Sequence, residues 1–303
     1  SGLDEILRGG LIPCRTYLVR GAPGTGKTIL GMHFMTAGEQ SLFISLSEPE
    51  GMVRAAADSL DIDLSDVTFL DLTPDAGFFA ESQTYDIFSP AEVERGPTTE
   101  AIVKRVQDLQ PKRVFIDAIS QLRYLTTDDQ AFRRHVFSLL RFLREQGVTV
   151  LVTSESGETL SDEDLQFVSD GVIQLERTEH RRAIRVLKLR GTGFHEGAHA
   201  LKITARGLRV FPRLVPDIHT RTFVPEPISS GVADLDALLH GGLERGTVTL
   251  ITGPIGVGKT TVGLHFLEDA ARRGERSVVY LFEESIETVV HRCESIDIPA
   301  EWM

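Results

Sequence analysis

The chain has 303 residues, of which 41% are hydrophobic and 25% charged, and its formal net charge is −12. It contains no apolar run near the roughly eighteen residues that a membrane-spanning helix needs, and an acidic balance opposes attraction to a nucleic-acid backbone. Cys14 and Cys293, the two cysteines, indicate neither a disulfide framework nor a metal cluster. With no visible secretory leader, we expect a cytoplasmic enzyme with no membrane partner and no nucleic-acid partner.

The first predicted strand, TYLVR at 16–20, leads into a glycine-rich loop. GAPGTGKT at 21–28 fits the phosphate-binding pattern G-x-x-x-x-G-K-[ST]. Its glycines let successive backbone N–H groups face a phosphate, and the helix opened by the loop presents its positive end to the same anion. Lys27 is expected to reach the β- and γ-phosphates, and Thr28 to offer its hydroxyl to Mg²⁺. The nucleotide-contacting residues predicted here are Gly21, Pro23, Gly24, Thr25, Gly26, Lys27, Thr28 and Ile29.

Two carboxylates end neighbouring apolar runs further along the chain. Asp117 ends VFID, where a buried carboxylate needs the compensation that a magnesium ion supplies, and we interpret it as the Walker B aspartate. Glu48 ends FISLSE, at the sheet edge where a doubly wound fold places its ligands, and is predicted to polarise the attacking water. The alternatives are an N-cap at Glu48 for a helix starting near Pro49 and an Asx turn at Asp117.

The runs 16–20, 41–46, 112–117 and 148–154 predict four buried strands of a mostly parallel sheet. One intervening helix is expected to be capped at Thr98–Glu100 and to end before Pro111, and another covers 132–147. The arginines of the second helix read as a solvated face rather than a nucleic-acid patch. After Gly147 the runs VIQLE, AIRVLKLR, HALKIT and LRVF predict an antiparallel extension of the sheet, and the proline-punctuated stretch after it predicts a linker.

A second phosphate-binding loop, GPIGVGKT, occupies 253–260, and the residues around it repeat as well. Glu48 corresponds to Glu284, which ends VYLFEE at an offset of 236, so a duplicated domain is the simplest explanation. The equivalent of Asp117 falls past Met303, so we expect the second copy to be incomplete. The predicted divisions are a first domain at 1–217, a linker at 218–228 and part of a second domain at 229–303. The nucleotide-contacting residues predicted in this copy are Gly253, Gly256, Val257, Gly258, Lys259, Thr260 and Thr261, with Thr260 also a metal ligand.

Five segments together resemble the KaiC family of RecA-type ATPases: SGLDEILRGGL, GAPGTGKT, FISLSE, VFID and KLRGTGFHEG with GLRVFP after it. The resemblance covers essentially the whole chain. It implies an α/β fold with a RecA-like P-loop and a mostly parallel central sheet, tandemly duplicated. It also implies ATP hydrolysis with ATP and Mg²⁺ bound between subunits of a homo-oligomeric ring, a hexamer. In that family the lysine and arginine of KLRG, here Lys188 and Arg190, reach the γ-phosphate of a neighbour's ATP. Without the resemblance, both read as solvated cations on one face of an edge strand.

The first copy departs from the family at one position. The usual pair of adjacent glutamates is Glu283-Glu284 in the second copy but Ser47-Glu48 in the first. We expect Glu48 to carry the catalytic role alone in the first copy, and Glu283 and Glu284 to carry it in the second.

The leading functional prediction is a signalling ATPase with protein partners, and the resemblance implies serine/threonine autokinase activity in a full second domain. The alternative is a DNA-handling ATPase related to RecA or RadA. The acidic balance, the lack of interleaved aromatic and basic residues and the tandem duplication favour the first class. A titration with single-stranded DNA separates the two.

Overall fold

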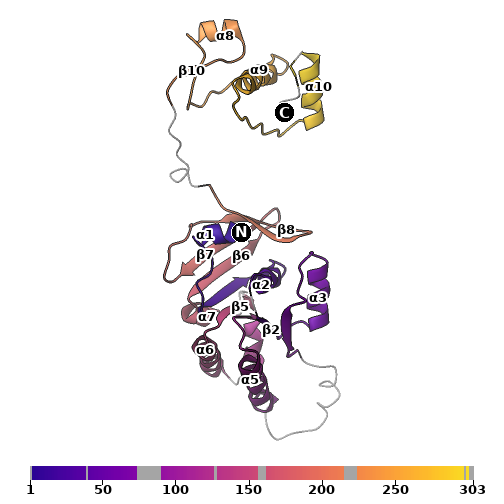
Figure 1. The fold of residues 1–303 in the computed structure, drawn as a ribbon, viewed down its shortest axis with the longest axis vertical. Coiled ribbons are helices and arrows are strands. Elements are labelled where there is room, and N and C mark those ends of the chain that lie inside the picture. The colour runs from indigo at the N-terminus through magenta and orange to yellow at the C-terminus, as the bar shows by residue number, and fades with distance from the viewer. Residues whose placement is uncertain are drawn as a thin grey trace. The chain divides into compact units, whose positions relative to one another are not determined.

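The structure is a computed structural model that describes residues 2–38, 40–73, 90–125, 128–155, 162–214, 224–296 and 298–299. The chain divides into two compact units, Ser1–Leu214 and Val215–Met303, and each is described by itself. Figure 1 shows the elements of both. The first unit contains α1 (Gly2–Ile6), β1 (Thr16–Gly21), α2 (Lys27–Thr36), β2 (Ser41–Ser45), α3 (Glu50–Asp58), β3 (Val67–Asp71), α5 (Pro90–Leu109), β4 (Arg113–Asp117), η1 (Ile119–Leu125), α6 (Asp129–Glu145), β5 (Thr149–Glu155), α7 (Glu163–Val168), β6 (Gly171–Arg177), β7 (Arg182–Leu189), β8 (His199–Thr204) and β9 (Gly207–Phe211). The second contains β10 (Pro227–Ile228), α8 (Ala233–Leu238), β11 (Leu243–Glu244), α9 (Lys259–Arg272) and α10 (Ile286–Ser295).

One nine-stranded sheet organises the first unit, in the order β3-β2-β4-β5-β1-β6-β7-β8-β9. The strands from β3 to β6 run parallel, and β7, β8 and β9 add an antiparallel extension, which confirms the predicted mostly parallel α/β sheet. Two details differ from the sequence prediction. The edge strand β3 was not predicted, and β6 belongs to the parallel part because it pairs in parallel with β1. Strand β3 escapes notice because its exposed and half-buried positions break the apolar run.

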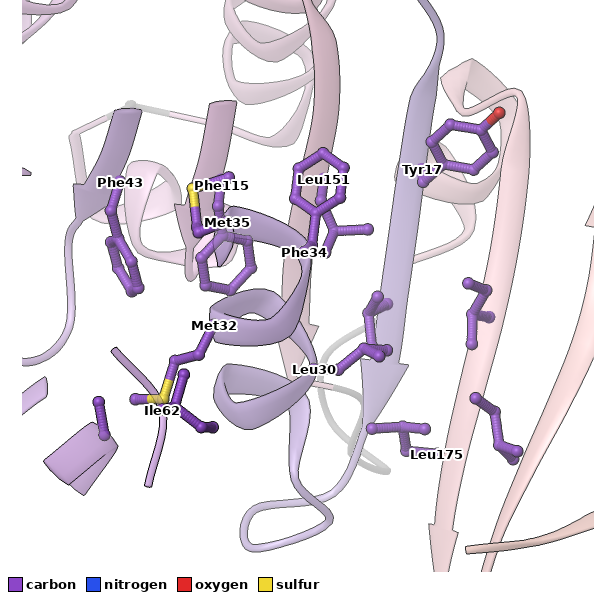
Figure 2. Packing of buried hydrophobic residues seen from close by; sticks show 14 of the residues in the cluster. Tyr17, Leu30, Met32, Phe34, Met35, Phe43, Ile62, Phe115, Leu151 and Leu175 are labelled. Atoms are coloured by element: carbon purple, nitrogen blue, oxygen red, sulfur yellow. The ribbon is translucent and has the colours of Figure 1, made fainter. Parts of the chain in front are cut away.

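Both faces of the parallel sheet are buried, and alternate residues of each strand serve opposite faces. Tyr17, Phe43 and Phe115 belong to one apolar cluster with α2 and α3, whereas Leu18, Leu42 and Val114, one position away, belong to the other with α5 and α6. Figure 2 shows the first cluster, with Met35 of α2 beside Phe115 of β4 and Met32 of α2 directed towards Ile62. Gly31 allows this approach: a Cβ there would lie 2.0 Å from Phe115 Cζ. The helix that follows the phosphate loop is therefore fixed tightly on the sheet.

The two long helices of the first unit match their predictions to different degrees. Helix α6 buries Val136, Leu139, Leu140 and Leu143 as predicted, and Asp128 caps it by accepting a 2.7 Å hydrogen bond from the Ala131 N–H. Helix α5 begins at Pro90 rather than at the cap predicted over residues 98–100. Proline suits the first helical position, where no partner is needed for its missing N–H, and the proline at position 97 does not end the helix. The predicted cap was therefore wrong.

The second unit has helices in the expected places but a different strand content. Within residues 224–296 the only paired strands are β10 and β11, and the predicted strand ending at Glu284 does not form. In the sheet of the first unit, strand β1 lies between β5 and β6, and β2 between β3 and β4, so these two strands do not pair with each other.

The consequence appears in the exposure of the second unit's apolar side chains. Val248 is 99% exposed and Phe282 94%, whereas the aligned residues, Thr16 of β1 and Leu46 directly after β2, are buried. The predicted linker at 218–228 falls partly outside the described residues, since only 224–228 of it is described, and that part includes β10. Among the helices of the described residues, none combines the length and apolar character needed to span a bilayer.

Candidate functional site

The loop at residues 21–28 connects the end of β1 to the start of α2. Gly24 and Gly26 have φ values of +74° and +105°, a left-handed region that residues with a Cβ rarely adopt. Gly26 is also closely covered, because a Cβ there would lie 3.3 Å from Ile203 Cδ1 of strand β8. The loop thus has the curled backbone, ending at a helix N-terminus, that binds a phosphate.

Lys27 is folded into this loop. Its ammonium donates to the carbonyl oxygens of Gly21 at 2.8 Å and Ala22 at 3.2 Å. Burial lowers the pKa of Lys27, and the nearby carboxylates of Glu155 and Asp117 partly offset that effect. A cation held by two neutral carbonyls in a buried place is a group that a polyphosphate can recruit.

Three of the residues predicted to contact the nucleotide have side chains that are unsuited to making that contact. The Thr25 hydroxyl donates to the Ala22 carbonyl at 2.8 Å, and the side chain is 1% exposed. Ile29 packs against the core beneath α2. Pro23 is exposed and has no N–H to donate. Thr25 and Ile29 can thus contribute to a phosphate site through their backbone N–H groups, and Pro23 only through its shape.

A hydroxyl and a carboxylate from different elements meet beside the loop. Thr28 Oγ1 donates to Asp117 Oδ2 at 2.6 Å, and the hydroxyl of Thr153 donates to Asp117 Oδ1. Burial raises the pKa of Asp117, while the hydrogen bonds from Thr153 and Thr28 and the charge of Lys27 act in the opposite direction. These side-chain bonds join Asp117 to α2 and β5, which does not support the alternative of an Asx turn. Hydroxyl and carboxylate oxygens at one buried point fit Mg²⁺, which prefers oxygen and keeps several waters.

The sequence analysis missed two residues at this point, Thr153 and Glu155 on strand β5. Thr153 is fully buried and holds Asp117, and Glu155 lies in register with Gly21. The sequence does contain a signal for both residues. Each is a polar residue at the carboxyl end of an apolar run, which is the pattern that identified Asp117.

Glu48 is exposed three residues beyond Ser45, which pairs with Asp117 in the sheet. It does not cap α3, because the Glu50 N–H donates to Asp71 of strand β3 at 2.9 Å. The N-cap alternative was therefore wrong. Ser47, which stands where the second copy has its first glutamate, accepts a 3.1 Å hydrogen bond from the Ala118 N–H. This serine ties the end of β2 to the segment that follows Asp117.

Lys188 and Arg190 lie towards the end of the strands opposite to the loop. Strand β7 is antiparallel to β6, so Lys188 pairs with Val172, which is level with Leu18 of β1. Arg190 is further still, since its N–H donates to the carbonyl of Asp170, ahead of β6. At about 3.3 Å per strand residue, roughly 10 Å or more of sheet separates both residues from Gly21. The structure does not bring them together with their own chain's loop.

Both cations have local partners. Lys188 donates to the carbonyls of Gln166 at 2.9 Å and Phe167 at 3.3 Å, and burial together with the nearby Arg190 lowers its pKa. Arg190 forms a 3.6 Å ion pair with Asp170. Strand β7 pairs with β8 only through Arg182–Ile184, so at Lys188 its one paired neighbour is β6, and the alternative of cations at a strand edge stays open.

The second loop repeats the first in conformation. Gly256 and Gly258 have φ values of +86° and +89°, and Lys259 donates to the carbonyls of Gly253 at 2.9 Å and Pro254 at 2.8 Å. Thr260 and Thr261 open α9, as expected of this motif, and Val257 is exposed.

The carboxylates predicted for the second site are arranged differently. Glu284 forms a 2.8 Å ion pair with Arg292 of α10, and Glu283 is exposed. No acidic partner for Thr260 equivalent to Asp117 occurs within the described part of this unit.

Comparison with known proteins is consistent with this site. The family model described as ATPase, KaiC matches residues 1–215 and 228–301. The circadian clock oscillator protein KaiC of a Picosynechococcus species is 33% identical over 322 residues, which cover 100% of this chain and 61% of that protein. The proteins of the same name from Prochlorococcus marinus and Acaryochloris marina are each 32% identical, over 100% and 94% of this chain and 63% and 56% of their own lengths. The chain thus spans about three fifths of the length of these curated relatives.

Proposed function

Because the chain belongs to the KaiC family of ATPases, we propose that it binds ATP with Mg²⁺ at the loop of residues 21–28 and hydrolyses it to ADP and phosphate. The observation that carries this proposal is the 2.6 Å contact between Thr28, in the loop, and the buried Asp117. A phosphate loop alone indicates binding. A loop with an acidic oxygen donor from a neighbouring strand also supplies a metal site beside the terminal phosphates.

Each side chain has a role in this reaction. Lys27 exchanges its two carbonyl partners for phosphate oxygens and stabilises negative charge on them. Thr28 and Asp117 hold the metal, and Thr153 keeps Asp117 in place. Glu48 accepts a hydrogen bond from the attacking water and orients it. Mg²⁺, when bound, neutralises charge on the β- and γ-phosphates.

We also propose that the site is completed by a second subunit. Lys188 and Arg190 cannot reach their own loop, so a role for them in phosphate chemistry requires another chain's nucleotide. Lys188 lies beside Phe167, which is 81% exposed and offers an apolar contact next to this cation. We define Phe167, Lys188 and Arg190 as the donor surface. In a ring, each donor surface can face the phosphate loop of the next subunit, so that the two cations reach its nucleotide and Phe167 contacts the neighbouring chain.

The finer family properties are proposals of the same kind. We propose a cytoplasmic, hexameric signalling ATPase with ATPase domains at 1–217 and 229–303, joined by a linker at 218–228, and a serine/threonine autokinase in a longer second domain. The relatives carry the name of a clock oscillator. The Ser47-Glu48 pair in place of two glutamates favours a different signalling output for this chain.

The loop lysines provide the first test. Lys27→Ala removes a charge-assisted phosphate contact, so we expect ATP affinity at the first site to fall by about a hundredfold and hydrolysis to disappear. Lys259→Ala is the matched control, since it makes the same change in the second loop, where the described residues contain no counterpart of the Thr28–Asp117 contact, and hydrolysis at the first site should persist. Retention of full ATP affinity and turnover in Lys27→Ala would show that the first loop is not the active site.

Mixing variants tests the shared site. Arg190→Ala subunits keep an intact loop, and Lys27→Ala subunits keep an intact donor surface. A mixed ring therefore regains some complete interfaces, and phosphate release should exceed the sum of the two variants and vanish on dilution. If light scattering shows that subunits exchange and activity never exceeds that sum, Arg190 acts on its own chain or not at all.

A further inference from the structure

Arg177, the last residue of β6, lies against the outside of the first phosphate loop. Strand β6 is the parallel neighbour of β1, whose end opens the loop. A Cβ built on Gly24 would lie 3.2 Å from Nη1 of Arg177. Gly24 stands at the bend of the loop, with φ +74°. A guanidinium therefore lies next to a backbone curled to bind an anion, in the same chain.

This guanidinium differs from its neighbours in having no acidic partner. Arg20 pairs with Asp162 at 3.0 Å, and Arg185 pairs with Glu176, the residue before Arg177, at 3.1 Å. Arg177 is exposed, and among the residues that the structure describes it forms no hydrogen bond and no ion pair. Asp162 and Glu176 are thus paired with other cations, and Arg177 remains available to an external anion.

We propose that Arg177 binds the polyphosphate of a nucleotide held in its own chain's loop, as a second cation beside Lys27. The proposal rests on the proposed function, because it assigns a ligand to the same loop. Lys27 approaches from inside the loop as a compact charge, whereas Arg177 approaches from the solvent side with a planar group that can bond two phosphate oxygens. Arg177 acts within one chain, unlike Arg190 of the donor surface.

Because Arg177 acts within one chain, its effect on nucleotide affinity should not depend on assembly of the subunits. The affinities of wild type, Arg177→Gln and Arg181→Gln for ATP, ADP and adenosine are measured by equilibrium dialysis, at protein concentrations above and below those at which light scattering detects assembly. Arg181 is the matched control, since it is an exposed arginine of the same hairpin with no hydrogen bond or ion pair from its side chain within the described residues. Both variants lose the same charge.

We expect Arg177→Gln to bind ATP and ADP about tenfold more weakly at both concentrations, because one charge-assisted contact is lost. Adenosine, which has no phosphate, should bind equally to all three proteins. Arg181→Gln should bind all three ligands like wild type. Arg177→Lys, which keeps the charge but not the planar group, should recover part of the loss. An exposed, unpaired side chain adds little stability, so nucleotide-free melting temperatures should agree.

Several results overturn the proposal: no loss in Arg177→Gln, an equal loss in Arg181→Gln, a loss that extends to adenosine, or a loss found only in the assembled protein. Lys27→Ala separates these outcomes from failure of the proposed function. If Lys27→Ala abolishes ATP binding and Arg177→Gln matches wild type, the loop binds nucleotide without Arg177. If wild type binds neither ATP nor ADP, the proposed function itself is wrong.

Discussion

The two phosphate loops of this chain have the same backbone and different surroundings. The left-handed glycines match pair by pair, and each lysine donates to the equivalent two carbonyls. The strand leading into the first loop is buried in the sheet, whereas Leu250, just ahead of the second loop, is 83% exposed. The loop conformation is thus determined by about eight residues of local sequence. The proposed metal site is not, because Thr28 needs Asp117, which pairs with it from a strand that starts at Arg113.

The largest expected difference between the copies concerns chemistry. Glu48→Gln keeps the size of the side chain but removes the anionic acceptor, so ATP should still bind while turnover falls by about a hundredfold. Glu284→Gln is the matched change in the second copy, where the carboxylate is ion-paired with Arg292, and it should leave turnover at the first site unchanged. Single-turnover phosphate release measures both. Equal effects of the two changes would mean that the copies are chemically equivalent.

Packing beneath the two loops should differ next. Gly31→Ala places a Cβ 2.0 Å from Phe115 Cζ, so we expect a loss of about 1–3 kcal/mol in the free energy of unfolding of the first unit. A Cβ added at Gly263 meets no atom within 4 Å. Because alanine is more favourable than glycine in a helix interior by about 1 kcal/mol, Gly263→Ala should not destabilise the second unit. Hydrogen exchange, measured on peptides from each unit, reports the effect of each substitution on the stability of its own unit. A stabilised first unit would contradict the close helix–sheet contact.

Asp117 should reduce the stability of the metal-free protein. Its folded pKa is raised, chiefly by burial, so the stability associated with its protonated form is present below the ordinary aspartate pKa of 3.8 and is lost as the pH rises through the folded pKa. Asp117→Asn should therefore raise the free energy of unfolding by up to about 2 kcal/mol at pH 7, and by less towards pH 4. Urea titrations at several pH values measure this difference. Mg²⁺ with ATP should raise the melting temperature of wild type but not of Asp117→Asn.

The smallest expected effect concerns His33, whose Nε2 accepts a 2.9 Å hydrogen bond from the Leu208 N–H. Burial lowers the pKa of His33, so its contribution is complete above pH 6.5 and is lost as the pH falls through the folded pKa. In His33→Gln, the free energy of unfolding should fall less on acidification than in wild type, by about 1 kcal/mol or less. Thermal melts of wild type and His33→Gln between pH 5 and 7 measure this difference.

The sequence predicted what depends on local pattern. Both loops, Asp117 as a metal ligand candidate, the apolar face of α6 and the α/β class follow from motifs or periodicity over a few residues. The failures have non-local causes. Whether VYLFEE forms a strand depends on partners elsewhere in the chain, and the N-terminal contact of α3 comes from Asp71 on an unpredicted edge strand. Arg177 carries no motif, and its place beside Gly24 results from strand order alone.

Strand order also determines the sequence of events during synthesis. A ribosome completes β1 and the first loop early, but the two neighbours of β1 begin at Thr149 and Gly171. Until those residues emerge, the nascent chain presents an apolar strand with both edges unpaired, although its phosphate loop can already take its final turn. Such a segment is open to aggregation and to binding by chaperones. Closing the sheet across so long a chain segment is expected to be slow compared with forming its helices.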